Sequence, residues 1–320
     1  MLDPNAPALV LAPMDGITDA PMRAFQGESG AFTYAVSEFI RVSGDPLPAK
    51  VFLRDVPEIG QGCRTSTGLP VQVQILGGHP ERMARSASTA VRAGATAIDI
   101  NFGCPAPTVN RSDGGASLLR HPERIRQIVA EVRAAVPAEV PVSVKLRLGW
   151  DDANAIYRNA EMAAKGGASW LTIHARTRVQ GYAPPVFWKP IGRVREALDL
   201  PVVANGDIWT IEDFRRCRDE TGCRHFMIGR SALANPALPY QIAQELGTGP
   251  ATAPVEDEWV PLMRRMLGHA HWHPKRAIAR TKQWLSIAHR FGGFELFDQV
   301  KHASSVEELF ERLQGVRFAT

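Results

Sequence analysis

The cysteine at position 104 is the residue best placed for chemistry in this sequence. Cys104 lies in the segment DINFGCPAPTVNRSDGGA, on a Gly-Cys-Pro turn directly after a β-rich run. A partly exposed thiol in such a turn can act as an acid or as a nucleophile. A buried structural thiol is the alternative, but a turn of this kind before a glycine-rich loop is not typical of a protein core. The sequence therefore predicts a catalytic Cys104.

The other three cysteines have no comparable setting. Cys217 lies in a polar helical stretch, Cys223 follows a turn glycine and Cys63 lies in a loop. No two cysteines have the spacing of a metal-binding pair, and four scattered cysteines are too few for a disulfide framework. We therefore expect three structural thiols, no bound metal and a reduced, cytoplasmic protein.

A second group of residues is suited to holding phosphate. The segments Asn205-Gly206-Asp207 and Gly229-Arg230 each follow a β-rich run and precede a helical stretch. Glycine lets the main chain approach an anion, a helix start offers free N–H groups, and arginine adds a two-pronged cation. Helix-capping turns are the alternative reading, but the paired occurrence favours a phosphate site.

Two further polar residues lie within apolar runs. Lys145 interrupts VSVKLRLG, and His174 occupies the equivalent place in the next run, LTIHAR. A buried lysine is costly without an anionic partner, so we expect Lys145 to contact an electron-rich ring or a phosphate. A histidine in this setting is often a satisfied core residue, and the functional reading of His174 is only slightly favoured.

These residues must be positioned by an alternation of strands and helices. A barrel of eight strands carries its active site at the carboxyl ends of the strands, where the polar residues lie here. The first strand ends in Pro13-Met14-Asp15-Gly16 and lacks the GxGxxG motif expected of an open, doubly wound sheet. The sequence therefore predicts a TIM (β/α)8 barrel. The expected strands are 8–14, 33–39, 70–77, 97–103, 141–149, 170–176, 201–207 and 225–230, and the clearest helices are 80–93, 121–136, 152–166, 209–220 and 231–245.

The composition changes near the end of the barrel pattern. The chain has 320 residues with a net charge of +4, and none of its apolar runs is long enough to span a membrane. The N-terminal stretch lacks the basic start of a secretory signal. We expect a catalytic barrel over 1–247, a linker over 248–258 and a small all-helical domain over 259–320.

The expected helical domain has a strongly basic segment. From Arg264 to Arg290 there are seven Lys or Arg residues, four His residues and no acidic residue. A solvated helix face is the ordinary explanation of such a segment. A nucleic-acid backbone would need the same surface, and Trp272 and Trp284 add possible stacking faces.

Seven motifs in this order resemble the tRNA-dihydrouridine synthase family. They are LAPMDGITD (11–19), VQILG (73–77), DINFGCP (99–105), VSVKLRLGWD (142–151), IHARTRVQGY (173–182), VVANGDI (202–208) and MIGR (227–230). SEFIRV (37–42) and IARTKQWL (278–285) resemble the C-type bacterial branch, which acts on position 16 of the D-loop. The resemblance implies bound FMN, NADPH as electron donor and tRNA as substrate, with no membrane and no protein partner implied.

The resemblance also implies roles for individual residues. Hydride would pass from FMN N5 to C6 of the uracil, and Cys104 would give a proton to C5. Ile287 and Lys301 depart from the branch, which carries an aromatic residue and arginine there, and Asp15 replaces the more usual Glu. The implied FMN contacts are Pro13, Met14, Asp15, Gln74, Lys145, His174, Asn205, Gly206, Asp207, Gly229 and Arg230, and the implied tRNA contacts are Arg41, Asn101, Tyr182, Arg280, Lys282 and Lys301.

Two other functions stay open at this point. An FMN barrel that reduces a free small molecule such as a pyrimidine would share the barrel and the phosphate site, but would not need the basic helical segment. A non-catalytic RNA-binding protein with a degenerate barrel would not need the polar strand ends.

Overall fold

The computed structural model describes residues 1–111, 114–249 and 258–317. Its centre is a closed barrel of parallel strands, in which the pairing of β2 with β4 joins the two ends of the sheet. The predicted TIM barrel is confirmed. The strands are β1 (Ala8–Leu11), β2 (Tyr34–Val36), β3 (Ile40–Arg41), β4 (Val71–Leu76), β5 (Ile98–Asn101), β6 (Val142–Arg147), β7 (Leu171–His174), β8 (Val202–Asn205) and β9 (His225–Ile228).

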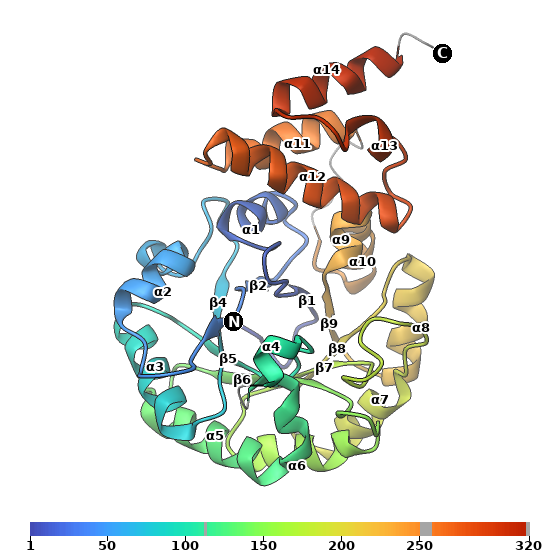
Figure 1. The fold of residues 1–320 in the computed structure, drawn as a ribbon. Coiled ribbons are helices and arrows are strands. Elements are labelled where there is room, and N and C mark those ends of the chain that lie inside the picture. The colour runs from blue at the N-terminus through green and yellow to red at the C-terminus, as the bar shows by residue number, and fades with distance from the viewer. Residues whose placement is uncertain (112–113, 250–257, 318–320) are drawn as a thin grey trace.

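Helices surround the barrel, and four more lie together at one side of its mouth, beside α1, α9 and α10 (Figure 1). The helices are α1 (Ala20–Gly27), α2 (Ala49–Asp55), α3 (Pro80–Arg92), α4 (Pro107–Asn110), α5 (Pro122–Ala135), α6 (Ala155–Lys165), α7 (Lys189–Ala197), α8 (Ile211–Thr221), α9 (Arg230–Ala234), α10 (Leu238–Leu246), α11 (Trp259–Gly268), α12 (Pro274–Arg290), α13 (Phe297–Val300) and α14 (Val306–Arg317), with 3-10 turns η1 (Pro57–Gln61) and η2 (Gly115–Arg120).

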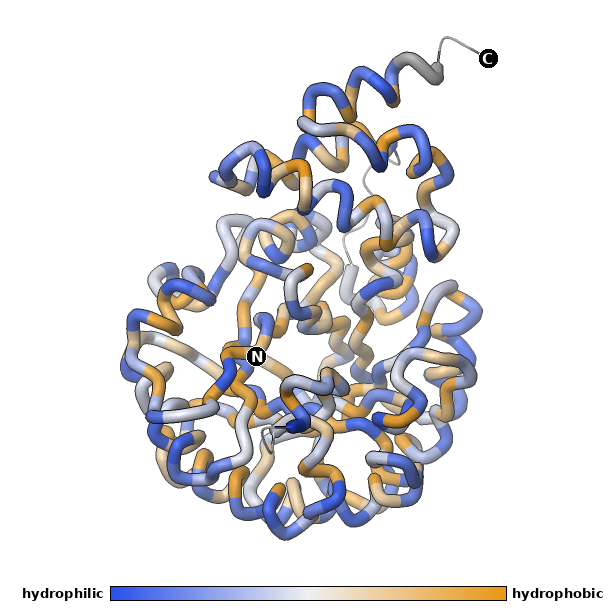
Figure 2. The backbone as a smooth tube through the Cα atoms, viewed as in Figure 1, coloured by the Kyte–Doolittle hydropathy of each residue, from blue (hydrophilic) through white to orange (hydrophobic). Residues whose placement is uncertain are grey.

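The outer helices are amphipathic, and Figure 2 shows hydrophobic and hydrophilic segments alternating along them. Their apolar faces cover the strands, whose residues are almost all buried. Helix α8 begins where the sequence predicts. Thr210 accepts the N–H of Asp213, and Asp213 accepts the N–H of Thr210, which is a complete capping box.

Polar side chains fill one half of the barrel interior and apolar ones fill the other half. An apolar cluster joins residues of β1, β2, β8 and β9, among them Val10, Tyr34 and Met227. On β4–β6, by contrast, Gln74 lies beside Asp99, and Asp99 lies beside Ser143. The polar half connects directly to the site described below.

The four C-terminal helices share a hydrophobic core with the barrel. Met22 and Phe25 on α1 and Leu233 on α9 pack with Met263, Trp284 and other residues of α11–α14. This core explains why the helices lie on α1 and α9. Among the described residues, no helix is long and apolar enough to cross a membrane.

The structure differs from the predicted elements in two places. The helix expected over 231–245 is two helices, α9 and α10, because Pro236 lacks the N–H that a continuous helix needs. The two-residue strand β3, which pairs with the end of β4, was not predicted. Most of the expected linker, residues 250–257, lies outside the described residues.

Candidate functional site

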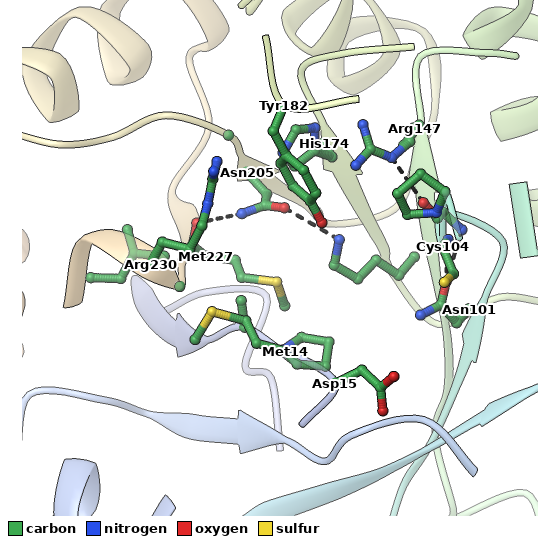
Figure 3. A pocket seen from close by; sticks show the side chains of 18 of the residues that line it. Met14, Asp15, Asn101, Cys104, Arg147, His174, Tyr182, Asn205, Met227 and Arg230 are labelled. Carbon is green, nitrogen blue, oxygen red and sulfur yellow. Dashed lines mark hydrogen bonds between the residues drawn. The ribbon is translucent and has the colours of Figure 1, made fainter. Parts of the chain in front are cut away.

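A pocket opens at the carboxyl ends of the barrel strands. It encloses about 550 Å³ and is lined by the loops after β1, β5, β7, β8 and β9 together with the ends of β5–β9. Most of the predicted site residues meet here (Figure 3). They are Pro13, Met14, Asp15, Asn101, Cys104, Lys145, His174, Tyr182, Asn205, Gly206, Asp207, Gly229 and Arg230.

Cys104 lies on the pocket wall and is half-buried. Asn101 fixes its turn, because the side-chain oxygen of Asn101 accepts the N–H of Gly103 at 2.8 Å and that of Cys104 at 2.9 Å. Burial raises the pKa of the Cys104 thiol, and the Asp15 carboxylate adds to that effect. The thiol is therefore held in its protonated form over a wider pH range than an ordinary cysteine. The remaining cysteines are buried, as predicted.

A chain of hydrogen bonds runs from the turn of Cys104 into the polar half of the barrel. Asn101 donates to Gln74 at 2.8 Å, and Gln74 donates to Asp99 at 2.7 Å. Ser143 donates to the other oxygen of Asp99. Burial raises the pKa of Asp99 to about 6. Gln74 is fully buried and lies behind the lining residues, where its amide anchors Asn101.

Lys145 lies at the base of the pocket. Its ammonium group donates to the side-chain oxygen of Asn205 at 3.3 Å, and Asn205 in turn donates to the carbonyl of Met227 at 2.8 Å. Among the described residues, Lys145 has no carboxylate within ion-pair distance. Burial and, to a smaller degree, the charge of Arg147 lower the pKa of Lys145 to about 8, while Asp99 opposes the change. An anion or an electron-rich ring at this position would stabilise the charged ammonium group and offset the cost of burying it.

The two predicted phosphate loops meet at one end of the pocket. The carboxylate of Asp207 binds Arg176, which is fully buried, and also Arg230 at 3.2 Å. Burial alone would raise the pKa of Asp207, but the hydrogen bonds and charge of Arg176, together with Arg230, lower it. Asp207 thus holds Arg230 in place, and its own carboxylate is already neutralised.

The main chain of these loops needs its glycines. Gly206 has φ +123°, and a Cβ there would meet the N atom of Ala175 at 3.1 Å. A Cβ at Gly229 would meet Ala12 and Met14, each at 3.1 Å. Larger residues would therefore displace the pocket walls.

His174 lies beneath the exposed ring of Tyr182, with the two ring centres 6.1 Å apart. Its Nδ1 atom is buried without a hydrogen-bond partner. Burial lowers the pKa of His174 well below its ordinary value, and four nearby cations add to the effect. The imidazole is therefore neutral, and its Nδ1 atom is a buried polar atom without a partner.

Four of the residues expected to contact tRNA lie away from the pocket lining. Arg41 donates to the carbonyl of Thr108, and Lys301 pairs with Asp298. Lys282 donates to the carbonyls of Lys301 and Ala303. Arg280 donates to the carbonyl of Ile17 and lies beside the carboxylate of Asp19.

Sequence reasoning missed an aromatic wall of the pocket. Trp209 lines the pocket and stacks on Phe291, with ring centres 4.2 Å apart and planes 22° apart. The guanidinium of Arg230 lies 5.3 Å from the Trp209 ring and 5.2 Å from the Phe291 ring. Nothing in the local pattern around Phe291 links it to a residue about 80 positions earlier.

Comparisons with known proteins find relatives that match most of the chain. The model of the dihydrouridine synthase (Dus) family matches residues 10–314. A tRNA-dihydrouridine(16) synthase of Cupriavidus necator is 44% identical over 288 residues, 88% of each chain. A protein of the same name from Pseudomonas putida is 43% identical over 284 residues, again 88% of each chain.

Solved structures show the same fold at low sequence identity. A 2-naphthoyl-CoA reductase complex has a TM-score of 0.57 and 10% identity, over 74% of this chain and 50% of the other. Morphinone reductase has a TM-score of 0.50 and 15% identity, over 76% and 87%. The family match and the two relatives cover most of the chain, and the chain belongs to the dihydrouridine synthase family.

Proposed function

We propose that this enzyme reduces uridine to 5,6-dihydrouridine in the D-loop of tRNA, at position 16. Bound FMN, itself reduced by NADPH, would supply the hydride for C6 of the uracil, and Cys104 would supply the proton for C5. The observation that carries the proposal is the position of Cys104, a half-buried thiol that shares one pocket with the paired phosphate loops.

The pocket has the features that FMN requires. Its volume of about 550 Å³ lies within the range of roughly 300–1,000 Å³ that ligand pockets occupy. Pro13, Met14 and Met227 offer an apolar wall for a flat ring system. Lys145 offers a cation without an ion-pair partner among the described residues, and the neutral ring of His174 lines the same pocket. Figure 3 shows Met14, Met227 and His174 around one space.

The opposite end suits a phosphate monoester. Gly206 and Gly229 let the main chain come close, and Arg230 offers its guanidinium from a fixed position beside Asp207. Asp207 would act through its main chain and by orienting Arg230, because its carboxylate is taken up by Arg176 and Arg230.

Cys104 would act as a general acid. Burial raises the pKa of its thiol, so that the proton is present near neutral pH. Asn101 fixes the turn, and we propose that it also contacts the uracil. A uridine stacked within folded RNA cannot reach this wall, so the base must turn out of its stack to enter the pocket.

We propose that residues 1–247 form the catalytic barrel, that 248–258 connect the two parts, and that 259–320 form a tRNA-binding unit. Tyr182 is 54% exposed at the pocket mouth, where it can stack on a base. Arg41 and the partly exposed Lys301 offer charge for the RNA backbone. The acid-free segment from Arg264 to Arg290 supplies further positive charge.

A map of dihydrouridine at nucleotide resolution tests this proposal. The host strain would lack its own dihydrouridine synthases and would express this protein alone. We expect a signal confined to position 16. A signal at another D-loop position would contradict the assigned position only. No signal from soluble, flavin-loaded protein would contradict tRNA as the substrate and would favour reduction of a small molecule.

A further inference from the structure

Helix α12 contacts three segments that line or adjoin the pocket. These are the loop after β1, the loop after β8 and helix α9. The helix lies across this side of the barrel mouth in Figure 1. Each contact uses a different residue of α12 or the residue that follows it.

The first contact holds the loop after β1. Arg280 donates to the carbonyl of Ile17 at 2.6 Å and lies 3.1 Å from the carboxylate of Asp19. Ile17 lines the pocket, and Asp19 caps the first turn of α1. The side chain of Arg280 is only 13% exposed. Met14 and Ile17 also pack against the hydrophobic core of the C-terminal helices.

The second contact holds the wall at the phosphate end. Phe291, the residue after α12, stacks on Trp209 and lies beside the guanidinium of Arg230. Offset stacking and the approach of a cation both favour this arrangement. Loss of the Phe291 ring would remove the stacking partner of Trp209 and one of the contacts that position Arg230.

The third contact holds the helix that begins at Arg230. The buried indole of Trp284 donates to the carbonyl of Leu233 at 3.0 Å. Gly293 packs so closely on Ala234 that a Cβ would lie 1.6 Å from its carbonyl oxygen. Helix α9 is therefore fixed from the side opposite the barrel.

We propose that α12 is a structural part of the cofactor site, and that Arg280 and Phe291 are positioning residues for the cofactor. The inference rests on the proposed function for the identity of the ligand as FMN. It gives Arg280 a role different from the tRNA contact that the resemblance implies. A phosphate group could engage this guanidinium only by competing with Ile17 and Asp19, which already hold it.

FMN affinity of the apoprotein tests the inference, because it is measured without tRNA or turnover. The variants are Arg280→Ala and Phe291→Ala, and the matched control is Lys275→Ala, an exposed cation on the same helix. Quenching of flavin fluorescence gives the Kd for FMN, and filter binding gives the Kd for tRNA. We expect FMN to bind about tenfold more weakly to the two variants. The control should match the wild type in its Kd for FMN.

Circular dichroism shows whether each alanine variant is folded. If one of them is not, two further variants keep the test decisive. Asp19→Asn weakens the Arg280 contact from the barrel side, and Phe291→Tyr keeps the stack. We expect weaker FMN binding from the first and near wild-type binding from the second. Unchanged FMN affinity in folded Arg280→Ala, with loss of tRNA binding only, would overturn the inference. A wild-type apoprotein that does not bind FMN would instead overturn the proposed function, and this inference with it.

Discussion

Asn101 holds Cys104 through the main chain, with its side-chain oxygen 2.9 Å from the Cys104 nitrogen. The same oxygen accepts the N–H of Gly103, so one side chain fixes the whole turn. The amide nitrogen of Asn101 is held by Gln74, and Gln74 by Asp99. The position of the thiol therefore depends on residues inside the barrel that do not line the pocket.

Asn101→Ala should slow uridine reduction while leaving the thiol in place. Displacement of a reacting group by about 1 Å can cost about a hundredfold in rate, and we expect a loss of that order. The measurement is the rate at which tRNA reoxidises the reduced enzyme in a single turnover. Asn159→Ala is the control, because Asn159 is buried and donates to Leu119 on another part of the barrel. Equal losses in both variants would point to general destabilisation.

Cys104→Ala should retain bound flavin and lose dihydrouridine formation. General acids contribute about 10²–10⁴ in rate, so a single turnover should slow by that factor. Cys217→Ala removes a buried thiol outside the pocket and should have no such effect. An unchanged rate in Cys104→Ala would exclude the thiol as the proton donor.

The pH dependence of the same reaction reports the protonation of Cys104. Burial raises the pKa of the thiol, so the acid form persists through neutral pH and is lost only as pH rises above this raised pKa. Single-turnover rates should therefore be flat near neutrality and fall in alkaline solution. Alkylation by iodoacetamide should rise over the same interval, since the thiolate is the reactive form. A fall in alkylation there would contradict this assignment.

Lys145→Met should weaken FMN binding and remove part of its pH dependence. Because the pKa of Lys145 is lowered to about 8, its charge is present below that pH and is lost above it. The wild-type affinity for FMN should therefore decline as pH rises through 8, and the variant should lack this decline.

The same substitution should stabilise the apoprotein. The unfolded chain keeps the ordinary lysine pKa of about 10.4, so the charged group disfavours folding at pH 7 and does so less as pH rises from 8. Urea unfolding of the apoprotein at pH 7 measures this effect. A less stable Lys145→Met apoprotein would contradict it.

Asp207→Asn should loosen the phosphate end of the pocket. The fully buried Arg176 would lose its charged partner, which costs about 3–5 kcal/mol when one member of a buried pair is removed. Arg230 would also be released, so FMN should bind more weakly. Thermal unfolding and FMN titration measure the two effects, with the exposed Asp219→Asn as control.

The same ion pairs should make the stability of the folded protein sensitive to acid. Arg176 and Arg230 lower the pKa of Asp207 in the folded protein. The ionised carboxylate therefore contributes fully to the stability of the fold above its ordinary pKa of about 3.9. That contribution is lost as pH falls through the lowered value. Asp207→Asn should therefore narrow the stability difference between pH 7 and strongly acidic solution.

The sequence was sufficient to predict the barrel, because each strand is a short apolar run followed by polar residues. It also located the turn of Cys104 and the two glycine-containing turns after β8 and β9, since Gly206 and Gly229 stand at strand ends. These features are local, and a single segment displays them. The helix after Gly229 was predicted too long because the effect of Pro236 was overlooked.

Contacts between distant segments could not be predicted from the sequence pattern. Arg176 is a fully buried arginine whose partner, Asp207, lies one strand later, and the pairing of β7 with β8 brings them together. Gln74 lies beside Asp99 in the strand register and anchors Asn101 from inside the barrel, while its expected contact with the flavin stays a prediction. The stack of Trp209 on Phe291 depends on how the C-terminal helices pack, which is set by a shared hydrophobic core.

That shared core has a consequence for the order of events during synthesis. Met22 and Phe25 emerge from the ribosome more than two hundred residues before Met263 and Trp284, the residues that cover them. At about 5–20 residues per second, α1 exposes its outward apolar face for tens of seconds after it is made. We therefore expect the nascent barrel to present an apolar surface that chaperones can bind until the last helices have been translated.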